Sequence, residues 1–215
     1  MKSDRETKEK LLKSAKSEFL EKGYMKSSLR KICVNAEVTT GALYFFFEGK
    51  EDLFASIVEP PLKTLTEVLI HHFTEDVSLL STPGFTENYS IEDDKEHQEL
   101  GKTLVHHLYE NYDAFMLLLT KAQGSRFENC VDVFVEMIEK NYKDMADSMA
   151  AQNPGSRVNE YMSHWFTHMS VDAFIHLLTH EPDEQKAMSH MKQIMDYIVR
   201  GWMDMILMLE KDFDA

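Results

Sequence analysis

The chain has 215 residues, a formal net charge of −14, and 43% hydrophobic and 11% aromatic residues. These values are typical of one or two folded domains and exclude an intrinsically disordered chain. No run of about 18 apolar residues occurs, which excludes a membrane-spanning helix, and the charged N-terminus lacks the apolar stretch of a signal peptide. The two cysteines, Cys33 and Cys130, provide no disulfide framework, so we expect a soluble protein in the reducing cytoplasm.

The hydrophobic pattern is helical along nearly the whole chain and predicts an all-α protein. Pro60 and Pro61 are expected to separate two helices or to kink one helix sharply. Ser90 and Ser125 each precede an acidic residue at the spacing of a capping box, so each is expected to begin a helix. The expected helices are 5–21, 28–36, 40–46, 50–58, 61–80, 90–110, 114–122, 125–151, 156–179 and 183–212, with the clearest loop at 81–90 and a turn at 153–155.

Charge is distributed unevenly along the chain. Residues 1–36 hold ten Lys and Arg against five Asp and Glu, a balance of +5, whereas residues 61–215 have a balance of −15. A basic head can bind phosphate in spite of an acidic body, because salt screens charges that are more than about 8–10 Å apart. The alternative is a lysine-rich first helix that is simply solvated.

Residues 28–50 have the organisation of a helix-turn-helix DNA-binding motif. Two short helices flank a turn at Glu37-Val38. A helix in the major groove needs small or hydrogen-bonding residues at its start, and the run Thr39-Thr40-Gly41-Ala42 satisfies this requirement. Tyr44 can hydrogen-bond to a phosphate, and Lys50 lies at the start of the next helix, where backbone N–H groups also favour phosphate. The alternative is an ordinary amphipathic helix pair.

The exact residues of this region indicate which kind of helix-turn-helix protein the chain resembles. Residues 8–54 contain Leu11-Leu12, Ala15, Phe19 and Gly23-Tyr24, then SSLRKI at 27–32, AEVTTGALY at 36–44, Phe47, and KEDLF at 50–54. In this order and without gaps, they resemble the DNA-binding domain of the TetR family of bacterial transcriptional regulators.

The resemblance implies a homodimeric repressor that a small molecule, bound in the C-terminal domain, releases from double-stranded operator DNA. It implies a helix-turn-helix DNA-binding domain at residues 1–58 and a helical ligand-binding and dimerisation domain at 59–215. No enzymatic activity and no cofactor are expected. The contacts implied for the recognition helix are Thr39, Thr40, Gly41 and Tyr44, and those implied for phosphate are Ser28, Arg30 and Lys50.

Three residues depart from the family pattern. Glu37 stands where the turn glycine is usual, so it must take a left-handed conformation or another turn geometry. Phe46 replaces a polar residue that is often histidine, and Lys31 replaces a common acidic capping residue. These departures affect the details of DNA contact.

The last two helices, 156–179 and 183–212, are expected to form an antiparallel pair and half of a dimeric four-helix bundle. The alternative is a packing layer in a monomer. We expect an apolar effector, with a lipophilic cation as the alternative that the acidic body suggests. Its binding is expected to move helix 50–58 against Pro60-Pro61. The candidate pocket residues, each of which also fits an ordinary core, are Leu65, Leu69, Phe73, Leu104, Leu108, Phe115, Leu118, Phe134, Met137, Tyr161, Trp165 and Met169.

A ladder of histidines on the penultimate helix suggests a second function. His164, His168, Asp172, His176 and His180 are spaced four residues apart, and such spacing can place two ligands on one metal ion. The alternative function is therefore a helical metal-binding sensor or enzyme that uses His164, His168 and His176. Ligands eight or more residues apart on one helix cannot all meet at one ion, so we expect interface or solvent-facing histidines instead.

Overall fold

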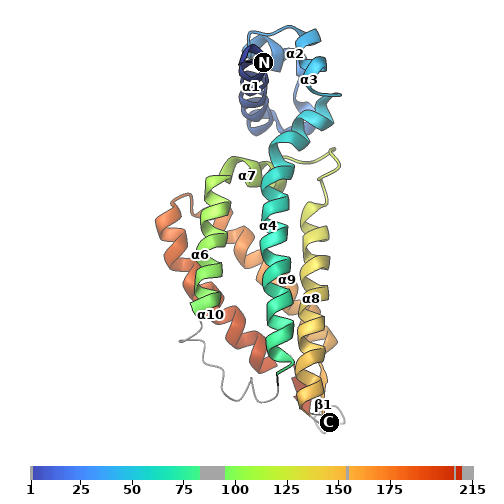
Figure 1. The fold of residues 1–215 in the computed structure, drawn as a ribbon, viewed down its shortest axis with the longest axis vertical. Helices are drawn as coiled ribbons and strands as arrows, with labels where there is room; N and C mark the ends of the chain where they lie inside the picture. Colours follow the sequence, from blue (N-terminus) through green and yellow to red (C-terminus); the bar gives the residue numbers. More distant parts are fainter. Residues whose placement is uncertain (1, 83–94, 154, 206, 210–215) are drawn as a thin grey trace. The chain divides into compact units, whose positions relative to one another are not determined.

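The computed structural model describes residues 2–82, 95–153, 155–205 and 207–209 (Figure 1). These residues are helical apart from two short strands and connecting turns, which confirms the all-α prediction. The elements are α1 (Lys2–Lys26), α2 (Leu29–Asn35), α3 (Thr40–Phe46), α4 (Lys50–Leu80), α6 (Lys95–Glu110), α7 (Tyr112–Thr120), α8 (Cys130–Gln152), β1 (Ser156–Val158), α9 (Glu160–His180), α10 (Glu184–Met205) and β2 (Leu207–Leu209). None of the helices in the described residues is long and apolar enough to cross a membrane. The predicted capping box at Ser90 lies outside the described residues, as does most of the predicted loop at 81–90.

Helix α1 is interrupted at Gly23. Leu11, Ala15 and Phe19 recur on one face of this helix, and all three side chains are fully buried. At Gly23 the backbone takes φ 73° and ψ 163°, a conformation that glycine adopts readily, and a short helical segment then leads to Lys26. Gly23 therefore interrupts α1 close to the predicted end of helix 5–21.

The turn between α2 and α3 contains a residue in the left-handed region. Glu37 has φ 56°, and it is the only described residue other than glycine with a positive φ. Two backbone bonds close the turn, from the N–H of Glu37 to the Val34 carbonyl at 3.1 Å and from the N–H of Val38 to the Cys33 carbonyl at 3.0 Å. The chain thus takes the first of the two predicted alternatives, a left-handed glutamate.

Helix α4 does not divide at its prolines. One helix runs from Lys50 to Leu80 with Pro60 and Pro61 inside it, so the expectation of two separate helices is wrong. A proline lacks the N–H that would bond four residues back, and the carbonyls of Ser56 and Ile57 therefore lack their usual amide partners. The prolines weaken α4 locally without ending it.

The segment between α7 and α8 is a compact turn. The helix predicted from Ser125 begins only at Cys130. Ser125 is buried, and its hydroxyl donates to the Ala122 carbonyl at 2.7 Å and accepts from the Phe127 N–H at 3.1 Å. Gly124, at φ 83°, donates its N–H to the Glu128 carboxylate at 2.9 Å. The polar groups of the predicted capping box therefore close a turn, and α8 begins after this turn, at Cys130.

A short strand pair replaces the predicted ends of the last two helices. Ser156–Val158 pairs antiparallel with Leu207–Leu209, so the last helix ends at Met205. The penultimate helix begins at Glu160, where the side chain of Asn159 accepts from the Met162 N–H at 3.1 Å. Asn159 is an effective N-cap, which explains why the helix starts later than predicted.

The contacts of the chain define two units. The first unit contains Met1–Thr64 and Glu110–Val131, and the second contains Leu65–Tyr109 and Asp132–Ala215. The predicted domain boundary at 58/59 falls inside α4. The first unit also takes in α7 and the turn after it, a segment from the middle of the predicted second domain. In the second unit, one buried cluster joins α6, α9 and α10 through Val105, Leu177, Ala187 and Met191.

The left-handed turn predicts the effect of restoring glycine. Replacing Glu37 with glycine should raise the free energy of unfolding by about 0.5–1 kcal/mol, because a side chain in the left-handed region costs more than the extra flexibility of glycine. Urea unfolding followed by circular dichroism measures this change. Asn35→Gly, at the end of α2, is the matched control and should lower stability. A Glu37→Gly protein less stable than wild type would contradict the strain argument.

Candidate nucleic-acid interface

A buried apolar frame holds α2 and α3 together. Ile32 and Cys33 of α2 and Leu43 of α3 are at most 2% exposed. Burial raises the pKa of the Cys33 thiol, and a hydrogen bond with Thr40 opposes this shift. Cys33 is therefore a core residue. Ser14 of α1 fixes the frame further by donating its hydroxyl to the Ile32 carbonyl at 2.9 Å.

Both helices begin at hydroxyl caps. The hydroxyl of Ser28 accepts from the Lys31 N–H at 3.4 Å, and that of Thr39 accepts from the Ala42 N–H at 3.1 Å. Since each cap uses only an acceptor lone pair, each hydroxyl can still donate its hydrogen to a phosphate or a base. Both residues are at least partly exposed, as are Arg30 of α2 and Thr40 of α3.

The outer face of α3 is open to solvent. Thr40 and Gly41 are exposed, and one turn later Tyr44 and Phe45 are 57% and 75% exposed. The Phe45 ring meets the ring of Phe46 edge-on at a centroid distance of 4.9 Å. The predicted contacts Thr39, Thr40, Gly41 and Tyr44 therefore share one exposed region, and sequence reasoning missed Phe45, whose large ring is exposed beside them.

Lys50 lies against the end of α1. Its ammonium donates to the carbonyls of Met25 at 3.2 Å and Ser27 at 3.3 Å, and it lies 4.6 Å from the centre of the Tyr24 ring. Burial lowers the pKa of Lys50, and the neighbouring Glu51 opposes this effect. The predicted phosphate ligand is therefore held in place by the segment that leads into α2.

A buried carboxylate supports the start of α2. Glu18 of α1 is 4% exposed and accepts from the Ser28 N–H at 3.4 Å. Lys31 forms an ion pair with it at 3.0 Å, and this hydrogen-bonded contact raises the pKa of Lys31. The lysine that departs from the family pattern thus neutralises a carboxylate from the preceding helix, a contact that local sequence does not reveal.

Glu51 connects three segments of the first unit. One carboxylate oxygen accepts from the Tyr24 hydroxyl at 2.6 Å, and the other accepts from the Arg126 N–H at 3.1 Å. Arg126 also forms an ion pair with Glu59 at 3.0 Å, and the Tyr24 N–H donates to the Lys121 carbonyl at 2.9 Å. The turn after α7 is thereby bonded to the end of α1 and to the first part of α4.

Residues 11–57 of this structure match the family model described as bacterial regulatory proteins, tetR family. Over these residues the chain is similar to the TetR family. Over 53 residues it is 49% identical to the HTH-type transcriptional repressor BepR of Brucella suis biovar 1 (strain 1330). The match spans 25% of this chain and 25% of BepR, so the likeness to BepR concerns only a quarter of either protein.

Solved structures resemble the fold over a longer span. A transcriptional regulator (TerR/AcrR family) from Aquifex aeolicus VF5 aligns with 89% of this chain and 99% of its own, with TM-score 0.56 and 21% identity. The TetR family regulator PfmR from Thermus thermophilus aligns with 88% of this chain and 94% of its own, with TM-score 0.57 and 18% identity. At these identities the likeness concerns the fold.

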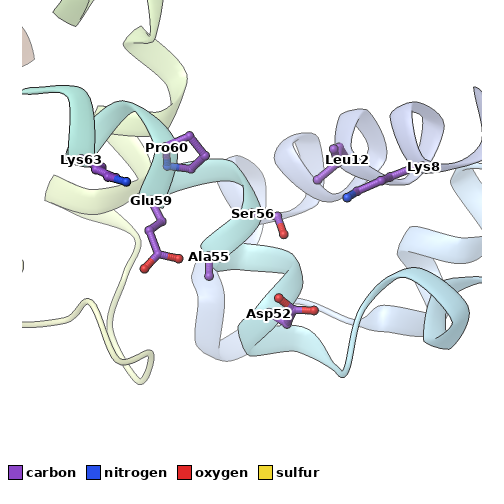
Figure 2. A pocket seen from close by; sticks show the side chains of 8 residues that line it. All are labelled: Lys8, Leu12, Asp52, Ala55, Ser56, Glu59, Pro60 and Lys63. Atoms are coloured by element: carbon purple, nitrogen blue, oxygen red, sulfur yellow. The ribbon is translucent and has the colours of Figure 1, made fainter. Parts of the chain in front are cut away.

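A surface pocket lies beside the TetR-family helices, between α1 and the first part of α4 (Figure 2). Lys8 and Leu12 come from α1, and the remaining lining residues come from α4. Two lysines and two acidic residues line the pocket, so their charges cancel, and Glu59 forms an ion pair with Arg126. These properties favour a solvated groove over a selective ligand site. The lining residues are Lys8, Leu12, Asp52, Ala55, Ser56, Glu59, Pro60 and Lys63.

The residues proposed for an effector pocket fall into different environments. Leu65, Leu69, Phe73 and Leu104 are buried in the second unit, where Leu108, Phe134, Met137 and Met169 are half-buried. Phe115 and Leu118 are buried in the first unit. Tyr161 and Trp165 on α9 are 75% and 42% exposed. Hydrophobic periodicity identified apolar faces but not the element that covers each face.

The interior of the second unit also contains polar groups that the sequence did not single out. The side chains of His72 and Asp76 are less than a tenth exposed and lie 3.2 Å apart. Tyr142 is surrounded by the rings of Phe73, Phe166 and Trp202, and burial raises its pKa to about 12. The buried Nε1 of Trp202 has no hydrogen-bond partner in the described part of the chain.

The histidine ladder forms two separate pairs. His164 lies edge-on to His168 at 4.6 Å and contacts Glu139 at 3.0 Å, while His176 stacks on His180 at 4.0 Å. Among the residues that the structure describes, no three His, Cys, Asp or Glu side chains are placed to hold a metal ion. His164, His168 and His176 therefore do not converge on one point.

The contacts of Glu51 predict that the Tyr24 hydroxyl stabilises the folded protein. Tyr24→Phe should lower the free energy of unfolding by about 1–2 kcal/mol, because a hydrogen bond to a charged acceptor is lost. Burial and, to a smaller extent, Glu51 raise the pKa of Tyr24 from 10.0 to about 12. The contribution of Tyr24 to the free energy of unfolding is therefore complete below pH 10.0 and is lost as pH rises toward 12. Urea unfolding across that pH range should therefore show a smaller decline in the free energy of unfolding for Tyr24→Phe than for wild type. Tyr44→Phe, an exposed control, should behave like wild type in both measurements.

Proposed function

We propose that this protein is a homodimeric transcriptional repressor that binds double-stranded operator DNA and is released by a small molecule. The outer face of α3, presented on a buried frame, is the observation that carries the proposal. The 49% sequence identity to the repressor BepR over 53 residues supports the proposal. Each subunit places α3 in a major groove, and the two-fold axis sets the separation of the two helices at about 34–36 Å.

Phosphate contacts fix the position of α3 in this proposal. Ser28 and Arg30 are exposed at the start of α2, and Lys50 lies beside Ser27. An ammonium has three donors, so Lys50 can bond a phosphate oxygen in addition to its two backbone carbonyls. The balance of +5 over residues 1–36 attracts the DNA backbone in general.

Exposed aromatic residues on α9 and α10 support dimerisation through these helices. Tyr161 and Trp165 of α9 and Tyr197 of α10 rank among the exposed large hydrophobic residues. Aromatic side chains are enriched at the cores of protein interfaces, where they lose this exposure. The histidine pairs on α9 would lie near such an interface.

The effector is proposed to bind inside the second unit. An apolar body would pack against the buried rings and leucines, and a hydrogen-bond acceptor on the effector would satisfy Trp202 Nε1, which is costly to leave unmatched. The carbonyls of Ser56 and Ile57 lack the amide bonds that Pro60 and Pro61 cannot donate, and we propose that α4 bends there when the effector binds.

A metal-binding sensor or enzyme based on His164, His168 and His176 remains the rival function. The separate pairing of these residues does not favour it. Metal analysis of purified protein, beside a gel shift with the DNA upstream of its own gene, separates the two functions.

The DNA contacts predict different effects for two substitutions. Lys50→Gln retains a donor for the Met25 and Ser27 carbonyls but removes the charge, so it should weaken all DNA sites and reduce the slope of log affinity against log salt by about one unit. Thr40→Ala should instead change sequence preference at constant slope. Lys102→Gln, in the second unit, is the charge-matched control. A salt slope unchanged by Lys50→Gln would refute the phosphate assignment.

The effector site predicts a spectroscopic change at Trp202. In a Trp165→Phe protein, Trp202 is the one remaining tryptophan, and a compound that releases DNA should shift its fluorescence. Trp202→Phe keeps an aromatic ring but removes the N–H, so it should weaken binding of that compound about fivefold or more. Equal binding by wild type and Trp202→Phe would place the effector elsewhere.

A further inference from the structure

We propose that α3 selects its operator by contacting the C5-methyl groups of thymine, and that Phe45 is the main residue that does so. This inference rests on the proposed DNA-binding function. It concerns the chemistry of the bases that are recognised, and it adds a specificity-determining residue to the interface.

The composition of α3 restricts the possible base contacts. Its sequence, TGALYFF, contains no Arg, Lys, Asn, Gln, Asp or Glu. Guanine is recognised mainly by Arg or Lys, adenine by Asn or Gln, and cytosine by carboxylates. The side chains of α3 therefore offer hydroxyl groups and apolar surface. Thymine is the base that presents an apolar group in the major groove.

Phe45 is placed to make an apolar contact. Its ring is 75% exposed and is packed edge-on against Phe46, which limits its orientations. Gly41 lies one turn before Phe45 on the same face of α3. The nearest atom to a Cβ built at Gly41 is Thr39 Oγ1 at 3.8 Å, so the surface beside Phe45 is open.

The charges around this apolar surface favour duplex DNA as its occupant. Arg30 and Lys50 come from α2 and α4, the helices on either side of α3. A partner protein with a purely apolar surface would leave these cations unmatched, whereas the phosphates that border a major groove match them. Thr40 and Tyr44 on the same face can contact a phosphate or a second thymine methyl group.

The test uses the full-length protein and DNA in which single thymines carry no methyl group. High-affinity sites are selected from a random duplex pool, and each thymine is then replaced by uracil, which pairs identically but lacks the C5-methyl group. Wild-type affinity should fall about fourfold for each contacted methyl group. The Phe45→Ala protein should bind thymine and uracil versions of at least one position equally well.

Two further measurements provide controls. Lys50→Gln should weaken thymine and uracil sites by the same factor, because phosphates are unchanged by the replacement. Thermal unfolding of Phe45→Ala should match wild type, because the removed ring is exposed and contributes little to the core.

The outcomes separate this inference from the proposed function. If the selection recovers no DNA, the proposed function fails. If wild type binds selected sites but tolerates uracil at every position, the function stands and the thymine inference is overturned. If thymine is preferred to uracil equally by wild type and Phe45→Ala, methyl recognition stands but its assignment to Phe45 is overturned. A selected site without thymine in its half-sites also overturns the inference.

Discussion

The geometry of the first unit depends on the two hydrogen bonds that the Glu51 carboxylate accepts. This carboxylate accepts from the Tyr24 hydroxyl at 2.6 Å and from the Arg126 N–H at 3.1 Å, so one side chain joins the end of α1 to the turn after α7. Lys50, the preceding residue, lies on the Tyr24 ring and bonds the carbonyls that precede α2. These bonds hold the segment that leads into α2, and the buried frame of Ile32, Cys33 and Leu43 then positions α2 and α3, which are too short to be stable alone.

Features that depend on neighbouring residues were predictable from the sequence. The caps at Ser28 and Thr39, the stop at Gly23 and the left-handed turn at Glu37 all arise from interactions within a few residues. The late start of α8 was not predictable, although Ser125 and Glu128 carried a capping pattern. The same polar groups can close a turn or begin a helix, and the left-handed Gly124 together with the burial of Ser125 decides between them.

Apart from Phe45, the exposed residues proposed to face DNA were likewise predictable, because helix period alone separates them from Ile32 and Leu43. The contacts of Lys50 and Glu51 were not, since their partners lie far away in sequence. The effector pocket was the least predictable part. Periodicity marked Phe115 and Tyr161 as apolar helical positions, but the first is buried in the first unit and the second is exposed. Which helix covers an apolar face is a property of topology.

The pair formed by Glu18 and Lys31 has an evolutionary consequence. Glu18 is buried, and its charge is matched by Lys31 at 3.0 Å. Removing the half-exposed Lys31 would leave the buried Glu18 carboxylate without its counter-ion and should lower the stability of the domain. An acidic residue at position 31 would also place two like charges together. Substitutions at the two positions should therefore be epistatic, and in close relatives the positions should covary, so that an acidic residue 31 accompanies a neutral residue 18.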